Sequence, residues 1–378
     1  MKKDLTIKPP LLLSLAHCRL QQRVASSTER VSEMESSSSS SSTAPARSLL
    51  LLLSLLVLAV VPHGGDARPP QLQLVRGARQ MAFDEGYTQI FGDGNLALLR
   101  DGRLVHLSLD ESTGAGFASQ DLFLHGFFSA AIKLPADYAA GVVVAFYLSN
   151  GDTYEKTHDE LDFEFLGNVR GREWRVQTNV YGNGRTAAGR EERYDLPFDP
   201  TDGFHHYSIL WTRRRIIFYV DETPIREVVR TAAMGAVFPS KPMSLYATIW
   251  DGSAWATLGG RYRVNYKYAP FVAEFGDLVL HGCAVDPVDR SAATSCGDAG
   301  YEEAAALSAA QRAAMAAFRR GHMSYSYCHD RRRYPVALSE CPLPGAAAST
   351  ATGRLFGPDG MKYDGRHRRR RRSRDSSS

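Results

Sequence analysis

Short apolar runs separated by Gly, Asp and Asn dominate the chain between residues 75 and 281. Clear examples are residues 141–148, 175–181, 206–211 and 215–221, and no long amphipathic helical pattern interrupts them. Regularly spaced strands of this length predict an antiparallel sandwich. Because Trp211, Phe218 and Tyr219 fall within tight strand alternation, we expect them in the core rather than on a sugar-binding surface.

Residues 157–167 show the sharpest alternation of polar and apolar positions. At a period of two, Glu160, Asp162 and Glu164 fall on one face, and the other face carries Leu161, Phe163 and Phe165. A helical period would scatter both sets around the cylinder. This stretch therefore predicts a strand whose apolar face lies in the core and whose three carboxylates point the opposite way.

Three like charges on one strand face are unfavourable unless they are used. Glycoside hydrolysis uses two carboxyl groups, which lie about 5–5.5 Å apart in a retaining enzyme. The Cα atoms of Glu160 and Glu164 would be roughly 13 Å apart on a straight strand, so their carboxyl groups can approach only on a curved, concave sheet. An acidic edge strand or a cation site remains the alternative interpretation.

Composition and charge set the broad class of the protein. The 378 residues carry a formal net charge of +4, and residues 368–372 form an Arg run, so the folded body is close to neutral and nucleic-acid binding is not indicated. Residues 34–67 combine Arg47, an apolar block at 49–61 and small residues, which is typical of a secretory signal peptide. The block is shorter than the about 20 residues of a membrane span. Residues 1–33 form an N-terminal extension without a clear pattern, and translation is expected to begin effectively at Met34.

The cysteines agree with export. Of the five cysteines, Cys18 lies in the N-terminal extension, and the other four, Cys283, Cys296, Cys328 and Cys341, all lie towards the C-terminus. An even count in the secreted part predicts two disulfides with three alternative pairings. A zinc site would need CxxC or matching His spacing, which this region lacks. No phosphate-binding loop or ligand cluster is present in the sequence, so we expect no metal and no cofactor.

The sequence His-Asp-Glu-Leu-Asp-Phe-Glu-Phe-Leu-Gly at 158–167 resembles the active-site signature of the plant xyloglucan endotransglucosylase/hydrolases, a branch of glycoside hydrolase family 16. The resemblance extends from about Phe83 to Cys341, and Leu161 stands where Ile is commoner. It implies a concanavalin-like β-jelly-roll sandwich with a small disulfide-bonded C-terminal extension. It also implies Glu160 as nucleophile, Glu164 as proton donor and base, and Asp162 as an assisting carboxylate.

The same resemblance implies sugar contacts in four further places. Two amides at i and i+2 suit sugar hydroxyls. The alternative for residues 177–179 is a satisfied polar ladder, and the alternative for residues 189–193 is a surface ion-pair loop. Without the resemblance, core packing would be about as good an explanation of the two tryptophans. The implied substrate-binding residues are Gln177, Thr178, Asn179, Gly189, Arg190, Glu191, Trp250, Trp255, Ala256, Gly259, Gly260 and Arg333. The implied disulfides are Cys283–Cys296 and Cys328–Cys341.

We therefore expect a catalytic jelly roll at 75–281, an extension at 282–345 with a helix over 302–320, and a disordered basic tail at 346–378. The body contains no Asn-X-Ser/Thr sequon, so no N-glycan is predicted. The expected partners are xyloglucan donor and acceptor chains, and the tail either adheres to acidic wall polysaccharide or is an inert solvated end. The protein is expected to be a secreted monomer of the cell wall or apoplast, with no membrane anchor after signal removal.

Three functions stay open at this point. The enzyme could transfer a cleaved glucan to another xyloglucan chain, or it could use the same site as a hydrolase with water as the acceptor. A non-catalytic carbohydrate-binding jelly roll is the third, since lectins share this architecture. The intact set of Glu160, Asp162 and Glu164 argues against the lectin, which would not need both glutamates.

Overall fold

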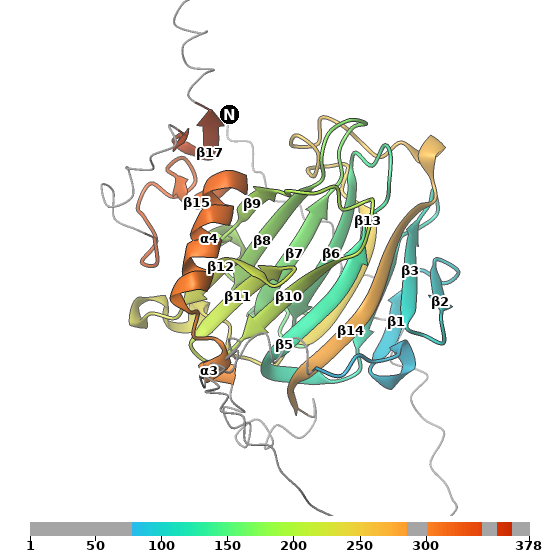
Figure 1. The fold of residues 1–378 in the computed structure, drawn as a ribbon, viewed down its shortest axis with the longest axis horizontal. Coiled ribbons are helices and arrows are strands. Elements are labelled where there is room, and N and C mark those ends of the chain that lie inside the picture. Colours follow the sequence, from blue (N-terminus) through green and yellow to red (C-terminus); the bar gives the residue numbers. More distant parts are fainter. Residues whose placement is uncertain (1–77, 286–300, 342–353, 365–378) are drawn as a thin grey trace, which may run out of the picture.

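The computed structural model describes residues 78–285, 301–341 and 354–364 (Figure 1). Two antiparallel sheets dominate these residues. In spatial order, the ten-stranded sheet contains β1 (Tyr87–Phe91), β4 (Ala115–Ser119), β13 (Ser244–Asp251), β6 (Val142–Ser149), β7 (Glu160–Leu166), β8 (Arg175–Tyr181), β9 (Glu192–Asp195), β15 (Met323–Asp330), β17 (Asp359–Asp364) and β16 (Arg354–Phe356). The seven-stranded sheet contains β12 (Thr223–Val229), β11 (Arg215–Val220), β10 (His205–Trp211), β5 (Leu122–Lys133), β14 (Phe271–Val285), β3 (Leu104–Leu109) and β2 (Leu96–Leu99).

Side chains from both sheets form one continuous core between them. Phe163 and Phe165 on β7 are fully buried and pack edge-on against Tyr207 of β10, with ring centroids 5.7 and 4.6 Å apart. Phe163 also meets Phe218 of β11 at 5.2 Å. The predicted all-β sandwich is thus confirmed. Aromatic side chains at alternate positions of β7 pack against the facing sheet and hold the two sheets together.

The predicted core tryptophan and its neighbours are also in place. Trp211 and Phe218 lie fully buried between the sheets. Tyr219 points to the opposite face of the same sheet, where it packs with Tyr301 in a second apolar cluster. That cluster covers the outer face of the seven-stranded sheet beneath α3 (Tyr301–Ala304).

β7 lies in the interior of its sheet, with β6 on one side and β8 on the other. Glu164 stands opposite Ala145 of β6 and Gln177 of β8. The alternative of an acidic edge strand is therefore wrong, because both backbone edges of β7 are paired.

The helix expected over 302–320 is divided into α3 and α4 (Ala309–His322). Ser308 divides them: its Oγ accepts a hydrogen bond from the Gln311 backbone N–H at 3.2 Å, and Gln311 Oε1 accepts one from the Ser308 N–H at 2.9 Å. This capping box starts a new helix at that point. α4 then packs against β12, β9 and β15 (Figure 1).

The prediction that 346–378 is disordered is wrong for residues 354–364, which form a hairpin of β16 and β17. β17 pairs with β15 and so extends the ten-stranded sheet. Gly360, at φ +72°, lets the turn pass Tyr325, since a Cβ there would lie 2.6 Å from the tyrosine ring. The turn residues of Gly357–Gly360 were the signal in the sequence for this hairpin. The Arg run lies outside the described residues.

Candidate active site

The three carboxylates of β7 lie on the face opposite the inter-sheet core, as the alternation predicted. Glu160 is partly exposed, whereas Asp162 and Glu164 are 4% and 7% exposed. Their cross-strand neighbours on this face are Tyr181, Asn179 and Gln177 of β8, in that order. Ser149 of β6 donates a hydrogen bond to Glu160 Oε2 at 3.0 Å. The carboxylates are thus held within a polar row rather than on an open solvated surface.

Asp159, directly before β7, anchors the start of this strand. It is fully buried and accepts hydrogen bonds from the backbone N–H groups of Asn183, Ser240 and Lys241 at 2.8–3.0 Å. The Lys241 Nζ is 2.7 Å from Asp159 Oδ1. One carboxylate therefore ties two loops to the residue before Glu160. No local pattern in the sequence indicates a role for Asp159, because its partners are distant in the chain.

The other end of β7 is anchored by Gly167 and Thr257. A Cβ on Gly167 would lie 1.9 Å from the Ala139 carbonyl oxygen, so only glycine fits. Thr257 Oγ1 donates to the Gly167 carbonyl at 2.7 Å and accepts from the Gly141 N–H at 2.8 Å. Thr257 thus fastens the loop that carries Trp255 to the end of the acid-bearing strand.

Trp250 and Trp255 lie near one another, with ring centroids 6.1 Å apart and planes at 41°. Both are partly exposed and neither belongs to the core clusters of the described residues, so core packing does not account for them. Among the residues that the structure describes, the Trp255 indole N–H has no hydrogen-bond partner. Gly259 and Gly260 adopt φ +69° and +84°, so the turn itself explains these glycines. Ala256 is partly exposed beside them.

The structure places Gln177 and Asn179, but not Thr178, on the face with the carboxylates. Gln177 Nε2 donates to Glu164 Oε2 at 2.5 Å. Asn179 Oδ1 accepts from the Arg190 backbone N–H at 2.8 Å. Thr178 points between the sheets, where its Oγ1 accepts from Arg226 Nη1 at 2.9 Å. Strand alternation therefore separates Thr178 from the substrate-facing set in which the resemblance placed it.

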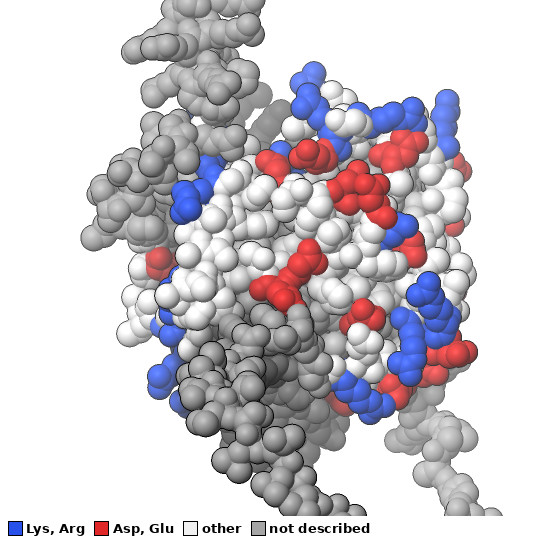
Figure 2. All heavy atoms as spheres, in the orientation of Figure 1, with Lys and Arg blue, Asp and Glu red and all other residues white. Residues whose placement is uncertain are grey.

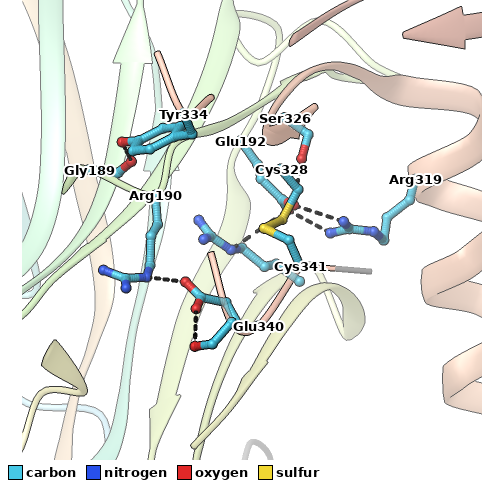
Figure 3. Close-up of a disulfide and its surroundings, with 11 residues drawn as sticks. Gly189, Arg190, Glu192, Arg319, Ser326, Cys328, Tyr334, Glu340 and Cys341 are labelled. Carbon is cyan, nitrogen blue, oxygen red and sulfur yellow. Dashed lines mark hydrogen bonds and ion pairs between the residues drawn. A yellow bond between two sulfur atoms is a disulfide. The ribbon is translucent and has the colours of Figure 1, made fainter. Parts of the chain in front are cut away.

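Residues 189–191 are clamped by the C-terminal extension. The Tyr334 hydroxyl donates to the Gly189 carbonyl, and Arg190 pairs with Glu340 (Figure 3). The Arg190 and Glu340 side chains are 4% and 8% exposed, so a solvated surface loop is not what the structure contains. Arg333 pairs with Glu191. The predicted residues Gly189, Arg190, Glu191 and Arg333 thus come together, and sequence analysis missed their partners Tyr334 and Glu340.

A buried charge cluster follows at Glu192. Arg319 of α4 donates to both of its carboxylate oxygens, at 2.6 and 2.8 Å (Figure 3). The Tyr194 hydroxyl donates to the same carboxylate at 2.6 Å. Arg226 Nε lies 3.6 Å from Glu192 Oε2. Burial alone would raise the pKa of Glu192, but the charges of Arg319 and Arg226 lower it to about 2. The extension is therefore joined to the body through ionised groups inside the protein.

The predicted disulfide Cys328–Cys341 is confirmed, with Cα atoms 5.3 Å apart. It closes the segment that carries Arg333, Tyr334 and Glu340 (Figure 3). The predicted Cys283–Cys296 disulfide lies outside the described residues, because Cys296 is not among them.

Comparisons with known proteins identify the family. A model of glycosyl hydrolases family 16 matches residues 83–268, and a model of the xyloglucan endo-transglycosylase C-terminus matches residues 295–341. The chain is 62% identical over 299 residues to probable xyloglucan endotransglucosylase/hydrolase protein 28 of Arabidopsis thaliana, covering 77% of this chain and 89% of that protein. The chain belongs to the xyloglucan endotransglucosylase/hydrolase family. The predicted family and enzyme class, a glycosyl hydrolase/transferase, are thereby confirmed.

Two further proteins are similar to the chain. Probable xyloglucan endotransglucosylase/hydrolase protein 27 of Arabidopsis thaliana is 61% identical over 299 residues, covering 78% of this chain and 88% of that protein. A prokaryotic β-1,3-1,4-glucanase (lichenase) derived from a mouse hindgut metagenome aligns at 23% identity with a TM-score of 0.43, covering 54% of this chain and 98% of that chain. The body of the chain and its C-terminal extension match two separate family models.

Other features of this xyloglucan endotransglucosylase/hydrolase family member concern ligands and surfaces. Within the described ranges, no three His, Cys, Asp or Glu side chains gather as a metal site would need. None of the helices there combines the length and apolar character that crossing a bilayer requires. On the face seen in Figure 2, basic side chains lie chiefly at the rim and acidic ones also nearer the middle, unlike the continuous basic patch of a nucleic-acid-binding surface.

A hollow of about 820 Å³ lies on the outer face of the seven-stranded sheet, away from β7. Phe127 and Tyr219 line it, together with carboxylates that include Asp221 and Asp277. Both aromatic residues are almost fully buried, so neither offers an open ring face for stacking on a sugar. The hollow therefore offers no stacking platform for a sugar from these two residues.

Proposed function

We propose that this enzyme is a cell-wall xyloglucan endotransglucosylase with a retaining mechanism. The observation that carries the proposal is the placement of Glu160 and Glu164 on one interior strand, on the face away from the core, with Asp162 between them. Family membership supplies the substrate class, because the Arabidopsis relatives carry xyloglucan endotransglucosylase/hydrolase in their names.

In the first step, Glu160 attacks the anomeric carbon of a β-1,4-glucan backbone and forms a glycosyl-enzyme. Glu164 gives its proton to the departing glycosidic oxygen, which leaves as the hydroxyl of the released chain. In the second step, the Glu164 carboxylate takes the proton of an acceptor hydroxyl, whose oxygen bonds to the anomeric carbon and releases Glu160. The negative charge of Asp162 between the two helps to keep their protonation states different.

Trp250 and Trp255 are proposed to form a sugar subsite beside these carboxylates. Their partial exposure supports this assignment. An aromatic face can stack on the apolar side of a sugar ring. Arg333 and Glu191, paired across the two modules, are proposed to line the other side of the site.

Transfer requires an acceptor hydroxyl to react in preference to water, which is far more concentrated. An ordered acceptor site achieves this by holding the hydroxyl close to the glycosyl-enzyme. The clamping of Gly189 and Arg190 by Tyr334 and Glu340 supports a rigid acceptor side. We therefore favour transfer over hydrolysis.

The remaining assignments are part of the same proposal. Residues 34–67 act as a signal peptide and deliver the protein to the cell wall, with residues 75–281 as catalytic body and 282–345 as the extension that completes it. The enzyme acts as a monomer without cofactor, and any adhesion of the Arg run to acidic polysaccharide is independent of catalysis.

One assay tests the proposal. The secreted protein is incubated with xyloglucan and a labelled xyloglucan oligosaccharide, and label incorporation and new reducing ends are followed together. Incorporation without new reducing ends is the expected result. New reducing ends alone would establish a hydrolase, and binding of the polysaccharide with neither product would establish a lectin.

A further inference from the structure

Four side chains form a single row across the acid-bearing face of the sheet. Glu164 on β7 stands directly opposite Gln177 on β8, which stands opposite Arg193 on β9, which stands opposite Tyr325 on β15. Successive contacts join them. Gln177 Nε2 is 2.5 Å from Glu164 Oε2, Arg193 Nε is 2.7 Å from Gln177 Oε1, and the Arg193 guanidinium lies 4.9 Å from the centre of the Tyr325 ring.

Arg193 determines which end of the Gln177 amide faces Glu164. A guanidinium has donors only, so the group that receives the Arg193 N–H must be the amide oxygen. The amide nitrogen must then point the other way, where it donates to the Glu164 carboxylate. Without Arg193, a half-turn of the amide would direct its oxygen at a carboxylate oxygen, which is repulsive. The geometry of Glu164 thus depends on a residue that does not touch it.

Arg193 is itself held by the C-terminal extension. The Tyr325 hydroxyl donates to Asp330 Oδ2 at 2.9 Å, and Gly360 of the β16–β17 hairpin packs against the Tyr325 ring. Burial lowers the pKa of the Arg193 guanidinium, with the neighbouring charges of Glu191 and Glu164 acting in the opposite direction. An arginine keeps its charge in such a setting. The extension therefore delivers a fixed cation and a fixed donor to the end of the row.

We propose that Arg193 is a positioning residue that holds the acid/base carboxylate Glu164 through Gln177, so that the C-terminal extension controls the protonation of the catalytic site. This inference rests on the proposed role of Glu164. It assigns the extension a second task besides any contact with acceptor sugar, because the row runs from β15 to the catalytic strand.

The charged groups around Glu164 set the direction of the expected pH effect. Glu160 and Asp162 on β7 repel a charge on Glu164, and β6 contributes the uncharged Ala145 opposite it. The cation Arg193 lies on β9, whereas the charge of Arg175 on β8 is offset by its partner Asp195. A cation and an amide donor favour the ionised carboxylate. When the Arg193 cation and the Gln177 amide donor are both lost, Glu164 keeps its proton to higher pH. The alkaline limb of the pH–activity profile therefore moves to higher pH.

The experiment compares the full-length secreted Arg193→Gln and Arg175→Gln variants with wild type. Arg175 is the matched control, since it lies on the same sheet face but bonds Asp195 at 3.2 Å rather than Gln177. We expect Arg193→Gln to lower kcat about tenfold with KM within about twofold, and to shift the alkaline limb of kcat/KM upward by about half a pH unit or more. Arg175→Gln should keep the wild-type rate and profile.

A double-mutant cycle with Gln177→Leu tests the route. If Arg193 acts through Gln177, Arg193→Gln should cost no further rate in the Gln177→Leu background. Arg193→Lys retains a donor and should recover most of the rate, and it replaces Arg193→Gln in the cycle if the latter does not fold. The inference would be overturned if the pH profile of Arg193→Gln superimposed on that of wild type, or if the rate losses of Arg193→Gln and Gln177→Leu were additive. An effect of Arg175→Gln equal to that of Arg193→Gln would also overturn it. An active Glu164→Gln variant would instead overturn the proposed function.

Discussion

Arg319 of α4 and the buried Glu192 of β9 form a two-pronged ion pair, with both carboxylate oxygens engaged at 2.6 and 2.8 Å. The consecutive residues 189–193 all contact the C-terminal extension, through a hydrogen bond to a backbone carbonyl, three ion pairs and a cation–π contact. One edge of the catalytic sheet is thus completed by residues from more than a hundred positions later in the chain. Four predictions follow from particular side chains of this arrangement and of the acid face.

Glu160→Ala should abolish most of the activity, because no glycosyl-enzyme can form without the nucleophile. We expect a loss of at least about a hundredfold in kcat, equivalent to roughly 3 kcal/mol of barrier. The label-transfer assay measures it, with circular dichroism as a check of folding. Ser149→Ala, which removes a donor to Glu160 but leaves the carboxylate, should lose far less. A Glu160→Ala loss below about tenfold would remove Glu160 as nucleophile.

Trp255→Ala should weaken substrate binding while sparing the chemical step. It removes the partly exposed ring that is proposed to stack on a sugar. We expect KM to rise about threefold to tenfold, because an aromatic stacking contact contributes about 0.5–1.5 kcal/mol. Initial-rate kinetics with xyloglucan measure this. An unchanged KM in Trp255→Ala, together with a lowered melting temperature, would indicate a structural role instead.

Glu192→Gln should destabilise the protein strongly. It leaves the buried Arg226 and the partly exposed Arg319 without their counter-charge, and breaking a buried pair in this way costs about 3–5 kcal/mol. Urea unfolding of the intact chain measures the change. Glu85→Gln, which breaks the exposed pair with Arg79, is the control and should cost less than about 1 kcal/mol. Equal effects of the two substitutions would contradict the importance of the buried cluster.

The same carboxylate predicts a loss of stability in acid. Folding lowers the pKa of Glu192 from 4.5 to about 2, so the folded state favours its ionised form. This contribution is fully present above pH 4.5 and is lost as the pH falls towards about 2. Unfolding free energies measured from pH 6 to pH 2.5 should show wild type and Glu192→Gln converging. Parallel curves would mean that Glu192 does not titrate as its surroundings require.

Local patterns carried much of the prediction. The period-two alternation of residues 160–165 identified β7 and its acid face, because which face a strand residue occupies depends only on its position along the strand. The same rule placed Trp211 and Phe218 in the core. Motif resemblance supplied the family and Cys328–Cys341. The same alternation predicts that Thr178 points away from the face that Gln177 and Asn179 share, so its exclusion from the substrate-facing set could have been read from the sequence.

The sequence by itself determined the strands, the inward and outward faces of each, and the kind of chemistry that the carboxylates of β7 can perform. Only the tertiary structure decided that Glu164, Gln177, Arg193 and Tyr325 share one row, that Glu192 meets Arg319, and that a hairpin from the tail extends the sheet. These contacts depend on strand order and register. Both are set by the packing of distant segments, so no local pattern encodes them.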